Sequence, residues 1–123
     1  MRIEGKIWGT TAEIFKENGC SVHLLDIKAG GFCSEHNHQA KRNYFFVLSG
    51  TLEVTIYRNG LIDTVTLTSG NSTAVEPGLF HKFTAKNRCR ALEFYNAILS
   101  ESDIKRRTHG GIKGNAASSI HKR

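Results

Sequence analysis

The sequence has few of the residues that stiffen or cross-link a chain: of its 123 residues, three are cysteine, one is proline and one is tryptophan. Cys20, Cys33 and Cys89 cannot all pair within one chain and lack metal-binding spacing, so we expect reduced, mostly buried thiols. No apolar run is long enough to cross a membrane, and the first residues contain no apolar signal-peptide core. We therefore expect one domain in the cytoplasm.

Helical periodicity is also missing from the sequence, and short β-branched and aromatic segments alternate with turn signals instead. The segments that read as strands are 12–28, 51–70, 72–85 and 89–99. Asn18-Gly19 lies inside the first segment and Asn59-Gly60 inside the second, and Asn-Gly is a strong signal for a tight hairpin turn. The pattern predicts an all-β protein, a small barrel or sandwich.

Acidic residues are missing from the C-terminal stretch 105–123, which carries six of the 17 basic residues. The remaining 11 basic residues balance the 11 acidic ones, so the body of the chain is formally neutral. A basic tail can contact nucleic acid, but no aromatic residue interleaves these charges. We expect a folded domain over 1–104 and a basic, flexible, solvated tail over 105–123, which argues against a nucleic-acid partner.

Two histidines stand out because they lie one residue apart in a stretch of strand-like sequence. Alternate side chains of a strand share a face, so His36 and His38 point the same way. The pair either lines a hydrated barrel interior or forms part of a metal site. His81 lies on a later strand-like segment, and we favour the metal site when the three are taken together.

The glycines around these histidines complete a pattern that resembles the two motifs of the cupin family of small β-barrels. The first motif is Gly, five residues, His-x-His, three or four residues, Glu, six residues and Gly. The second motif is Gly, five residues, Pro-x-Gly, two residues, His, three residues and Asn. The matching positions here are Gly30, His36, His38, Asn43, Gly50, Gly70, Gly78 and His81. Asn43 stands where the family has its acid, and Glu76 and Ala85 stand where the second motif has Pro and Asn.

A closer likeness is to the cupin domain of type II mannose-6-phosphate isomerases. It rests on KIWG at 6–9, VLSGTLEV at 47–54 and ESDIKRR at 101–107. The likeness implies a sugar or sugar phosphate as ligand. Those domains also carry the acid that Asn43 replaces, so isomerase activity does not transfer directly.

The cupin resemblance implies a single-domain jelly-roll barrel, a double-stranded β-helix, that forms a homodimer. His36 and His38 would face inward from one strand, Asn43 from the next, and His81 from a strand across the interior. Three neutral imidazoles suit a divalent transition metal such as Fe, Mn, Zn or Ni and leave positions open for a ligand. Asn43 would be a weak fourth ligand or would hold a metal-bound water.

Two classes of function fit this site. The first is a metal-binding cupin that binds or transforms a small oxygenated metabolite, as a metal-dependent isomerase or a dioxygenase if it is an enzyme. The second is a non-catalytic binding or sensor module with a degenerate metal site. By strand alternation we expect Phe45, Val47 and Phe83 to line the interior and Cys33 to point away from the cavity.

Overall fold

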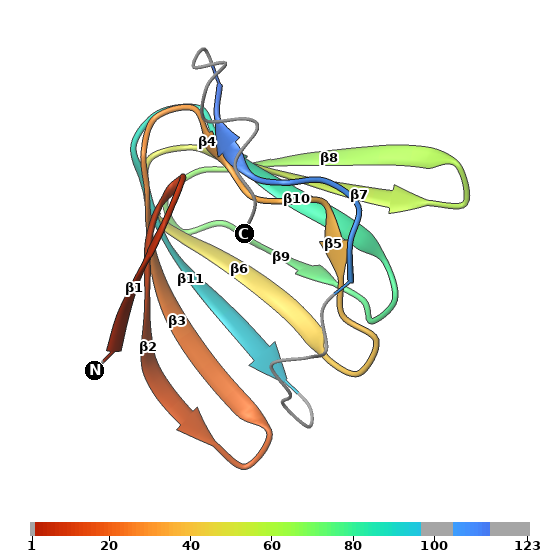
Figure 1. The fold of residues 1–123 in the computed structure, drawn as a ribbon, viewed down its shortest axis with the longest axis horizontal. Coiled ribbons are helices and arrows are strands. Elements are labelled where there is room, and N and C mark those ends of the chain that lie inside the picture. The colour runs from red at the N-terminus through yellow and green to blue at the C-terminus, as the bar shows by residue number, and fades with distance from the viewer. Residues whose placement is uncertain (1, 97–104, 114–123) are drawn as a thin grey trace.

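The computed structural model of this protein describes residues 2–96 and 105–113, and these residues form β-strands and turns (Figure 1). No helix capable of crossing a membrane occurs in this part of the chain. The strands are β1 (Arg2–Lys6), β2 (Gly9–Glu17), β3 (Cys20–Ile27), β4 (Gly31–Phe32), β5 (His36–Asn37), β6 (Arg42–Ser49), β7 (Leu52–Arg58), β8 (Leu61–Leu67), β9 (Ser72–Val75), β10 (Phe80–Ala85), β11 (Cys89–Asn96), β12 (Lys105–Arg106) and β13 (Gly111–Ile112).

The strands form two sheets that face each other, as in a jelly-roll barrel. The first sheet has the order β1-β2-β3-β11-β6-β9, and the second has the order β12-β5-β10-β4-β13 with the β7–β8 hairpin paired to β10. Figure 1 shows the strands of the two sheets on opposite sides of the interior. The all-β barrel expected from the sequence is confirmed.

Both expected Asn-Gly hairpins are present. Asn18 and Asn59 have φ values of 43° and 44°, and the glycines that follow them both have a φ of 79°. Two successive residues with positive φ form the turn whose twist matches the flanking strands. The β2–β3 and β7–β8 hairpins therefore have the register that these dipeptides predict.

The apolar core lies between the two sheets. Phe45, Val47 and Phe83 are buried there, as strand alternation predicts. Trp8, which precedes β2, packs its ring edge-on against Phe83 at a centroid distance of 5.0 Å. Burial of large side chains supplies most of the stability of such a barrel, at about 1.5–3 kcal/mol for each fully buried side chain.

The outer face of the first sheet also carries apolar side chains. Tyr44 and Phe46 of β6 and Leu92 and Phe94 of β11 line a shallow groove of about 630 Å³ on that face. Their strand neighbours Phe45 and Glu93 point into the barrel instead. Both faces of the β6–β11 pair are therefore partly apolar, and hydrophobicity alone does not tell which face is inside.

Part of the expected C-terminal tail belongs to the barrel. β12 pairs with β5 and β13 pairs with β4, and the backbone amide of Lys113 donates to the carbonyl of Gly30 at 2.7 Å. The expectation of a flexible tail is thus wrong for residues 105–113. Residues 114–123 lie outside the described part of the chain.

Candidate metal centre

The three histidines of the motif meet inside the barrel. His36 is on β5, His38 follows that strand by one residue, and His81 is on β10. All three are buried, and one ring nitrogen from each lies within 4.8 Å of the others. Ring centroids are 4.5 Å apart for His36 and His81 and 5.0 Å apart for His36 and His38. The structure therefore brings together the triad that the sequence predicts.

His81 lies on the same sheet as His36, whereas we expected it on a strand across the interior. β10 is the direct neighbour of β5, and His81 is paired with His36 in the antiparallel register. Antiparallel partners project side chains to the same face, so these two imidazoles are adjacent on one sheet. It is Asn43, on β6 of the other sheet, that faces the triad from across the interior.

Hydrogen bonds at Nδ1 orient two of the rings. The Nδ1 atom of His36 donates to the carbonyl oxygen of Ser34 at 2.7 Å, and Nδ1 of His81 donates to the carbonyl oxygen of Leu79 at 3.0 Å. A proton on Nδ1 leaves the lone pair on Nε2, which is the form that binds a metal. The backbone thus selects the tautomer that a metal needs at both positions.

Burial keeps these imidazoles uncharged. It is the main cause that lowers the pKa of His36 well below 6.5, and repulsion from His81 and His38 lowers it further. Burial also lowers the pKa of His81, against a smaller opposing effect of its hydrogen bond to Leu79. Neutral imidazole is the ligand form, so the site is ready for a cation at neutral pH.

Asn43 lies against the triad and is fully buried, with an exposed fraction of 0%. Its Nδ2 atom is 3.3 Å from Nε2 of His81 and donates to Oε2 of Glu93 at 3.0 Å. Its Oδ1 atom is buried and has no hydrogen-bond partner among the described residues. A buried amide oxygen without a partner is costly, so this side chain is under a specific constraint.

Glu93 is the functional candidate that sequence reasoning missed. It lies on β11 with an exposed fraction of 7%, and it shares the inward face with its cross-strand partner Phe45. Leu92 and Phe94 flank it and are the more apolar residues, so alternation alone suggests that Glu93 faces outward. Cys89 and Ala91 could have indicated the inward face, because they alternate with Arg90 and share one face of β11 with Glu93.

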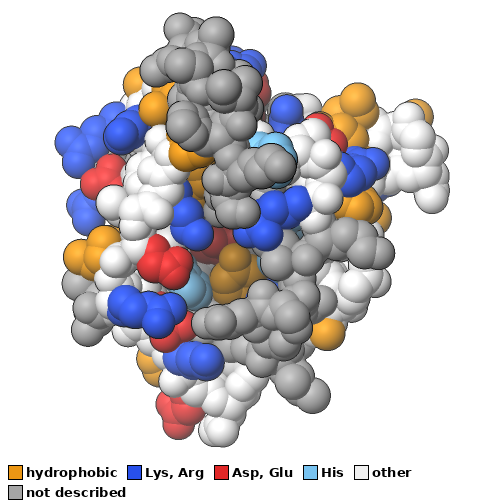
Figure 2. Space-filling model, in the orientation of Figure 1, with side chains coloured by type: hydrophobic (Ala, Val, Ile, Leu, Met, Phe, Trp, Pro, Cys, Tyr) orange, Lys and Arg blue, Asp and Glu red, His pale blue; other side chains and the backbone are white. Residues whose placement is uncertain are grey.

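A cavity of about 170 Å³ opens beside the triad. Its lining includes Trp8, His36, Phe83, Glu93 and Tyr95, together with Cys33. Figure 2 shows side chains of both charge signs around the hollow in the middle of this face.

The position of Cys33 corrects the sequence analysis, which directed this side chain away from the cavity. Cys33 is buried, its Sγ accepts a hydrogen bond from the amide of Phe83 at 3.2 Å, and it lines the cavity. The chain leaves strand geometry between β4 and β5, at residues 33–35, so the alternation cannot be counted across this gap.

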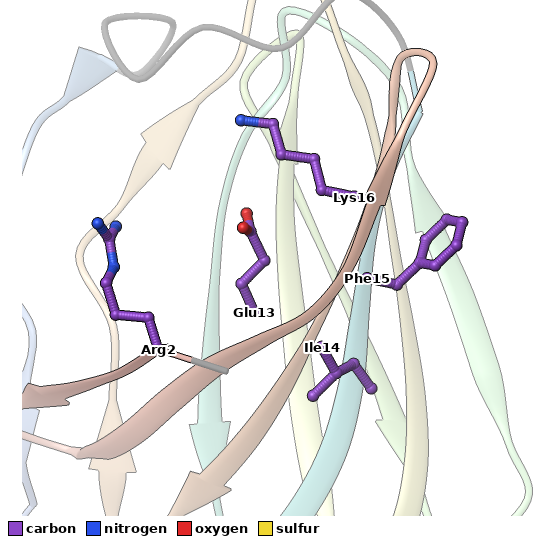
Figure 3. Close-up of a pocket in the computed structure, with 5 residues that line it drawn as sticks. All are labelled: Arg2, Glu13, Ile14, Phe15 and Lys16. Carbon is purple, nitrogen blue, oxygen red and sulfur yellow. The ribbon is translucent and has the colours of Figure 1, made fainter.

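A second hollow, of about 400 Å³, lies over the β1–β2 hairpin. It is lined by Arg2, Glu13, Ile14, Phe15 and Lys16, whose side chains spread in different directions (Figure 3). All five residues are exposed, and a register shift between Glu13 and Phe15 turns the apolar side chains outward. Arg2, Glu13 and Lys16 lie on the same side of the hairpin (Figure 3), but they are exposed, so this hollow lacks the buried polar groups of a candidate site.

A family model for the cupin domain matches residues 23–95, which is more than half of the chain. The chain belongs to the cupin family. The match spans both motifs and all three histidines. A comparison with curated proteins finds no match to this cupin.

Solved structures of oxalate decarboxylase from Bacillus subtilis have a similar fold. One determined at pH 4.6 has a TM-score of 0.77 and is 17% identical, and the match covers 85% of this cupin and 29% of that chain. A variant of the same enzyme with one tryptophan replaced by phenylalanine has a TM-score of 0.78 and is 17% identical, and the match covers 86% of this cupin and 30% of that chain. This cupin spans under a third of those chains, and at this identity the likeness shows the fold alone.

Proposed function

We propose that this cupin binds one divalent transition metal through His36, His38 and His81 and holds a small oxygenated ligand in the adjoining cavity. The observation that carries the proposal is the convergence of three buried ring nitrogens within 4.8 Å. Three neutral nitrogen donors fit Fe, Mn, Zn or Ni and leave coordination positions for a ligand. Asn43 is fully buried beside His81 and adds a polar side chain to the site.

The chain's own residues would orient the ligand in this site. A bound divalent ion supplies Lewis-acid polarisation of a carbonyl or carboxylate oxygen. Trp8 and Phe83 would contact the apolar part of a ligand, and Glu93 and Tyr95 place polar groups in the same cavity. Glu4, Lys6 and Arg106 also line the cavity, so its lining combines apolar and charged side chains. Convergent polar groups beside an apolar surface are typical of a site for a small organic molecule.

A small carboxylate is one candidate ligand, since a metal with open coordination positions can bind its oxygen atoms. The sugar-phosphate ligand suggested by the likeness to mannose-6-phosphate isomerase domains stays a candidate to be tested beside it. Thermal stabilisation of the metal-loaded protein by mannose 6-phosphate, but not by oxalate or acetate, would favour the sugar ligand. The opposite order would favour the carboxylate.

A non-catalytic binding or sensor module is the second candidate function. It is favoured by Asn43, since an amide at this position cannot act as the general base that a carboxylate would provide. Oxygen uptake by the iron-loaded protein would support a dioxygenase, and interconversion of a hydroxy-aldehyde and its ketone would support an isomerase. Ligand-dependent stabilisation with neither reaction would support the binding module.

Replacement of each ligand histidine by alanine tests the metal site. We expect His36→Ala, His38→Ala and His81→Ala each to lower metal affinity by more than the roughly 10–100-fold that loss of an outer-shell partner costs. Elemental analysis by mass spectrometry of protein purified without chelator gives the metal content. His109→Ala is the matched control, because His109 is exposed and outside the triad. Wild-type metal content in all three variants would refute the site.

A further inference from the structure

We propose that Asn43 is not a metal ligand but a hydrogen-bond donor, fixed by Glu93, and that the site it serves selects an anionic ligand on the metal. The inference rests on the proposed metal site and goes beyond it by assigning the roles of two buried side chains. Glu93 acts here as a positioning residue, because it works through Asn43. The ligand class that follows is a small anion with an acceptor atom, such as a carboxylate.

The contact with Glu93 decides which way the Asn43 amide points. The Nδ2 atom lies 3.0 Å from a carboxylate oxygen of Glu93, and only an N–H group can donate there. An amide oxygen in the same place would set two acceptors against each other. The amide holds this orientation although Oδ1 is then buried with no hydrogen-bond partner among the described residues. The hydrogen bond from Nδ2 to the Glu93 carboxylate therefore determines the orientation of the amide, although Oδ1 then lacks a donor among the described residues.

The same Nδ2 atom also faces the metal-binding nitrogen of His81, at 3.3 Å. An amide nitrogen has no lone pair to give to a metal, so Asn43 in this orientation cannot complete the ligand set. When the lone pair of His81 Nε2 is used by a metal, the second N–H of Asn43 no longer has that acceptor. It is then available to donate to an atom of the ligand held beside His81.

Glu93 is held rigidly enough to enforce this arrangement. It projects from β11, whose partners on either side are β3 and β6, so the strand is fully paired. Glu93 is opposite Phe45, and Asn43 is opposite Tyr95, which makes Asn43 and Glu93 diagonal neighbours on one inward face. Asn43 cannot turn to solvent without leaving the core, and Glu93 is 7% exposed and faces the interior cavity.

The charge of the site favours the same ligand class. The three imidazoles that would bind a divalent ion are uncharged, and the buried carboxylate of Glu93 contacts Asn43 instead. The ligand set itself therefore leaves the charge of the ion uncompensated. An anion that binds the ion gains this attraction and the Asn43 N–H together. Hydrogen bonds to charged groups are stronger than those between neutral groups.

The test uses cobalt(II)-loaded protein and azide as the anionic probe, followed by visible absorption. For Asn43→Leu we expect cobalt affinity within about threefold of wild type and azide affinity about tenfold weaker or more, as expected for one lost hydrogen bond to a charged group. Glu93→Met, which has no acceptor, should weaken azide binding similarly. Glu93→Gln retains an acceptor oxygen and should restore most of it. Glu76→Gln, an exposed acid outside the site, is the matched control.

The outcomes separate this inference from the proposed function. Loss of cobalt binding by about tenfold or more in a folded Asn43→Leu protein would make Asn43 a ligand and overturn the inference, while the metal site would stand. Unchanged azide affinity in both variants would overturn it as well. A wild-type protein that takes up no cobalt would overturn the metal site and the inference with it.

A second measurement avoids the risk that the variants fail to fold. In zinc-loaded wild-type protein labelled with ¹⁵N, the side-chain NH₂ signals of Asn43 should shift when azide is added, because one N–H gains an anionic acceptor. Unmoved signals at saturating azide would overturn the inference.

Discussion

His36 and His81 show how a barrel interior prepares an imidazole for a metal. Each ring donates its Nδ1 proton to a carbonyl two residues earlier in the chain, so Nε2 is the atom left to bind. Burial then lowers the pKa of both rings, which removes the competing proton at neutral pH. The tautomer and the charge state are thus set by the fold before any metal arrives.

This arrangement predicts an unusual pH dependence of metal affinity. Because the pKa values of His36 and His81 are lowered, both rings stay neutral as the pH falls through about 6.5, where an exposed imidazole gains its proton. We expect the affinity for zinc, measured by competition with a chelator, to stay nearly constant from neutral pH to 6.5 and to fall only at lower pH. A decline centred on pH 6.5 would mean that the rings titrate as exposed groups do.

The triad was predictable from the sequence, whereas its acidic neighbour was not. His36, His38 and His81 sit at motif spacing, and a motif specifies ligands without knowledge of the register. Glu93 depends on which face of β11 is inside, and the larger apolar residues Leu92 and Phe94 are on the outer face. A pattern of alternation therefore identifies a strand here but cannot identify its inner side.

At the scale of elements, residues 105–113 form a strap across β4 and β5. Arg106 is paired with His36, and the amide of Arg107 donates to the carbonyl of Glu35 at 2.7 Å. The guanidinium of Arg107 also stacks over the ring of Phe80, 3.8 Å from its centroid. The short strand that carries the first ligand histidine is therefore supported on its outer edge by the C-terminal segment.

Truncation tests the role of this strap. We expect a chain that ends at residue 104 to lose about 2–4 kcal/mol of unfolding free energy, because it loses several backbone hydrogen bonds worth about 1 kcal/mol each. A chain that ends at Lys113 keeps these contacts and is the matched control. Urea unfolding measures both. Equal stability would mean that β12 and β13 contribute nothing to the barrel.

The turn after β6 offers a second test at this scale. Gly50 and Gly60 have similar positive φ values, 84° and 79°, but a Cβ at position 50 would overlap the carbonyl oxygen of Arg88 and lie 2.8 Å from Cα of Cys89. A Cβ at position 60 meets nothing within 4 Å. Gly60→Ala should cost about 1–2 kcal/mol of unfolding free energy from backbone strain alone, and Gly50→Ala clearly more. Equal costs in urea unfolding would contradict the close approach at Gly50.

At the scale of the whole molecule, the apolar core and the metal centre lie in one barrel, and each contributes its own part of the free energy of unfolding. The core cluster includes Leu25, Ile27, Leu52 and Val54, which do not depend on a metal for burial. A metal that binds only the folded state adds to this stability by mass action.

We therefore expect the metal-free protein to be folded and the metal-loaded protein to melt at a higher temperature. At a free metal concentration 100 times the dissociation constant the added stability is about 2.7 kcal/mol. Differential scanning calorimetry with zinc and with a chelator measures the effect, and His81→Ala should abolish the difference. Unfolding on addition of chelator would show that the metal is structural.

The overall fold was predicted where a turn dipeptide or a motif marks the chain and missed where pairing alone creates a strand. Asn18-Gly19 and Asn59-Gly60 specify hairpins locally, and both are present. β12 and β13 are two residues each, and they are strands only because β5 and β4 offer them an edge. No local signal in a basic, glycine-containing segment could indicate those partners.

His36 and His81 are neighbours in space, yet the whole β7–β8 hairpin lies between them in the chain. A ribosome delivers His36 and His38 well before the strand that carries His81, so the emerging chain has only two of the three triad imidazoles. Metal binding by all three histidines requires that β10 has been synthesised and has paired with β5. The metal that binds would then depend on which ions are available to the folded protein. Affinities of such sites generally increase toward the later first-row metals.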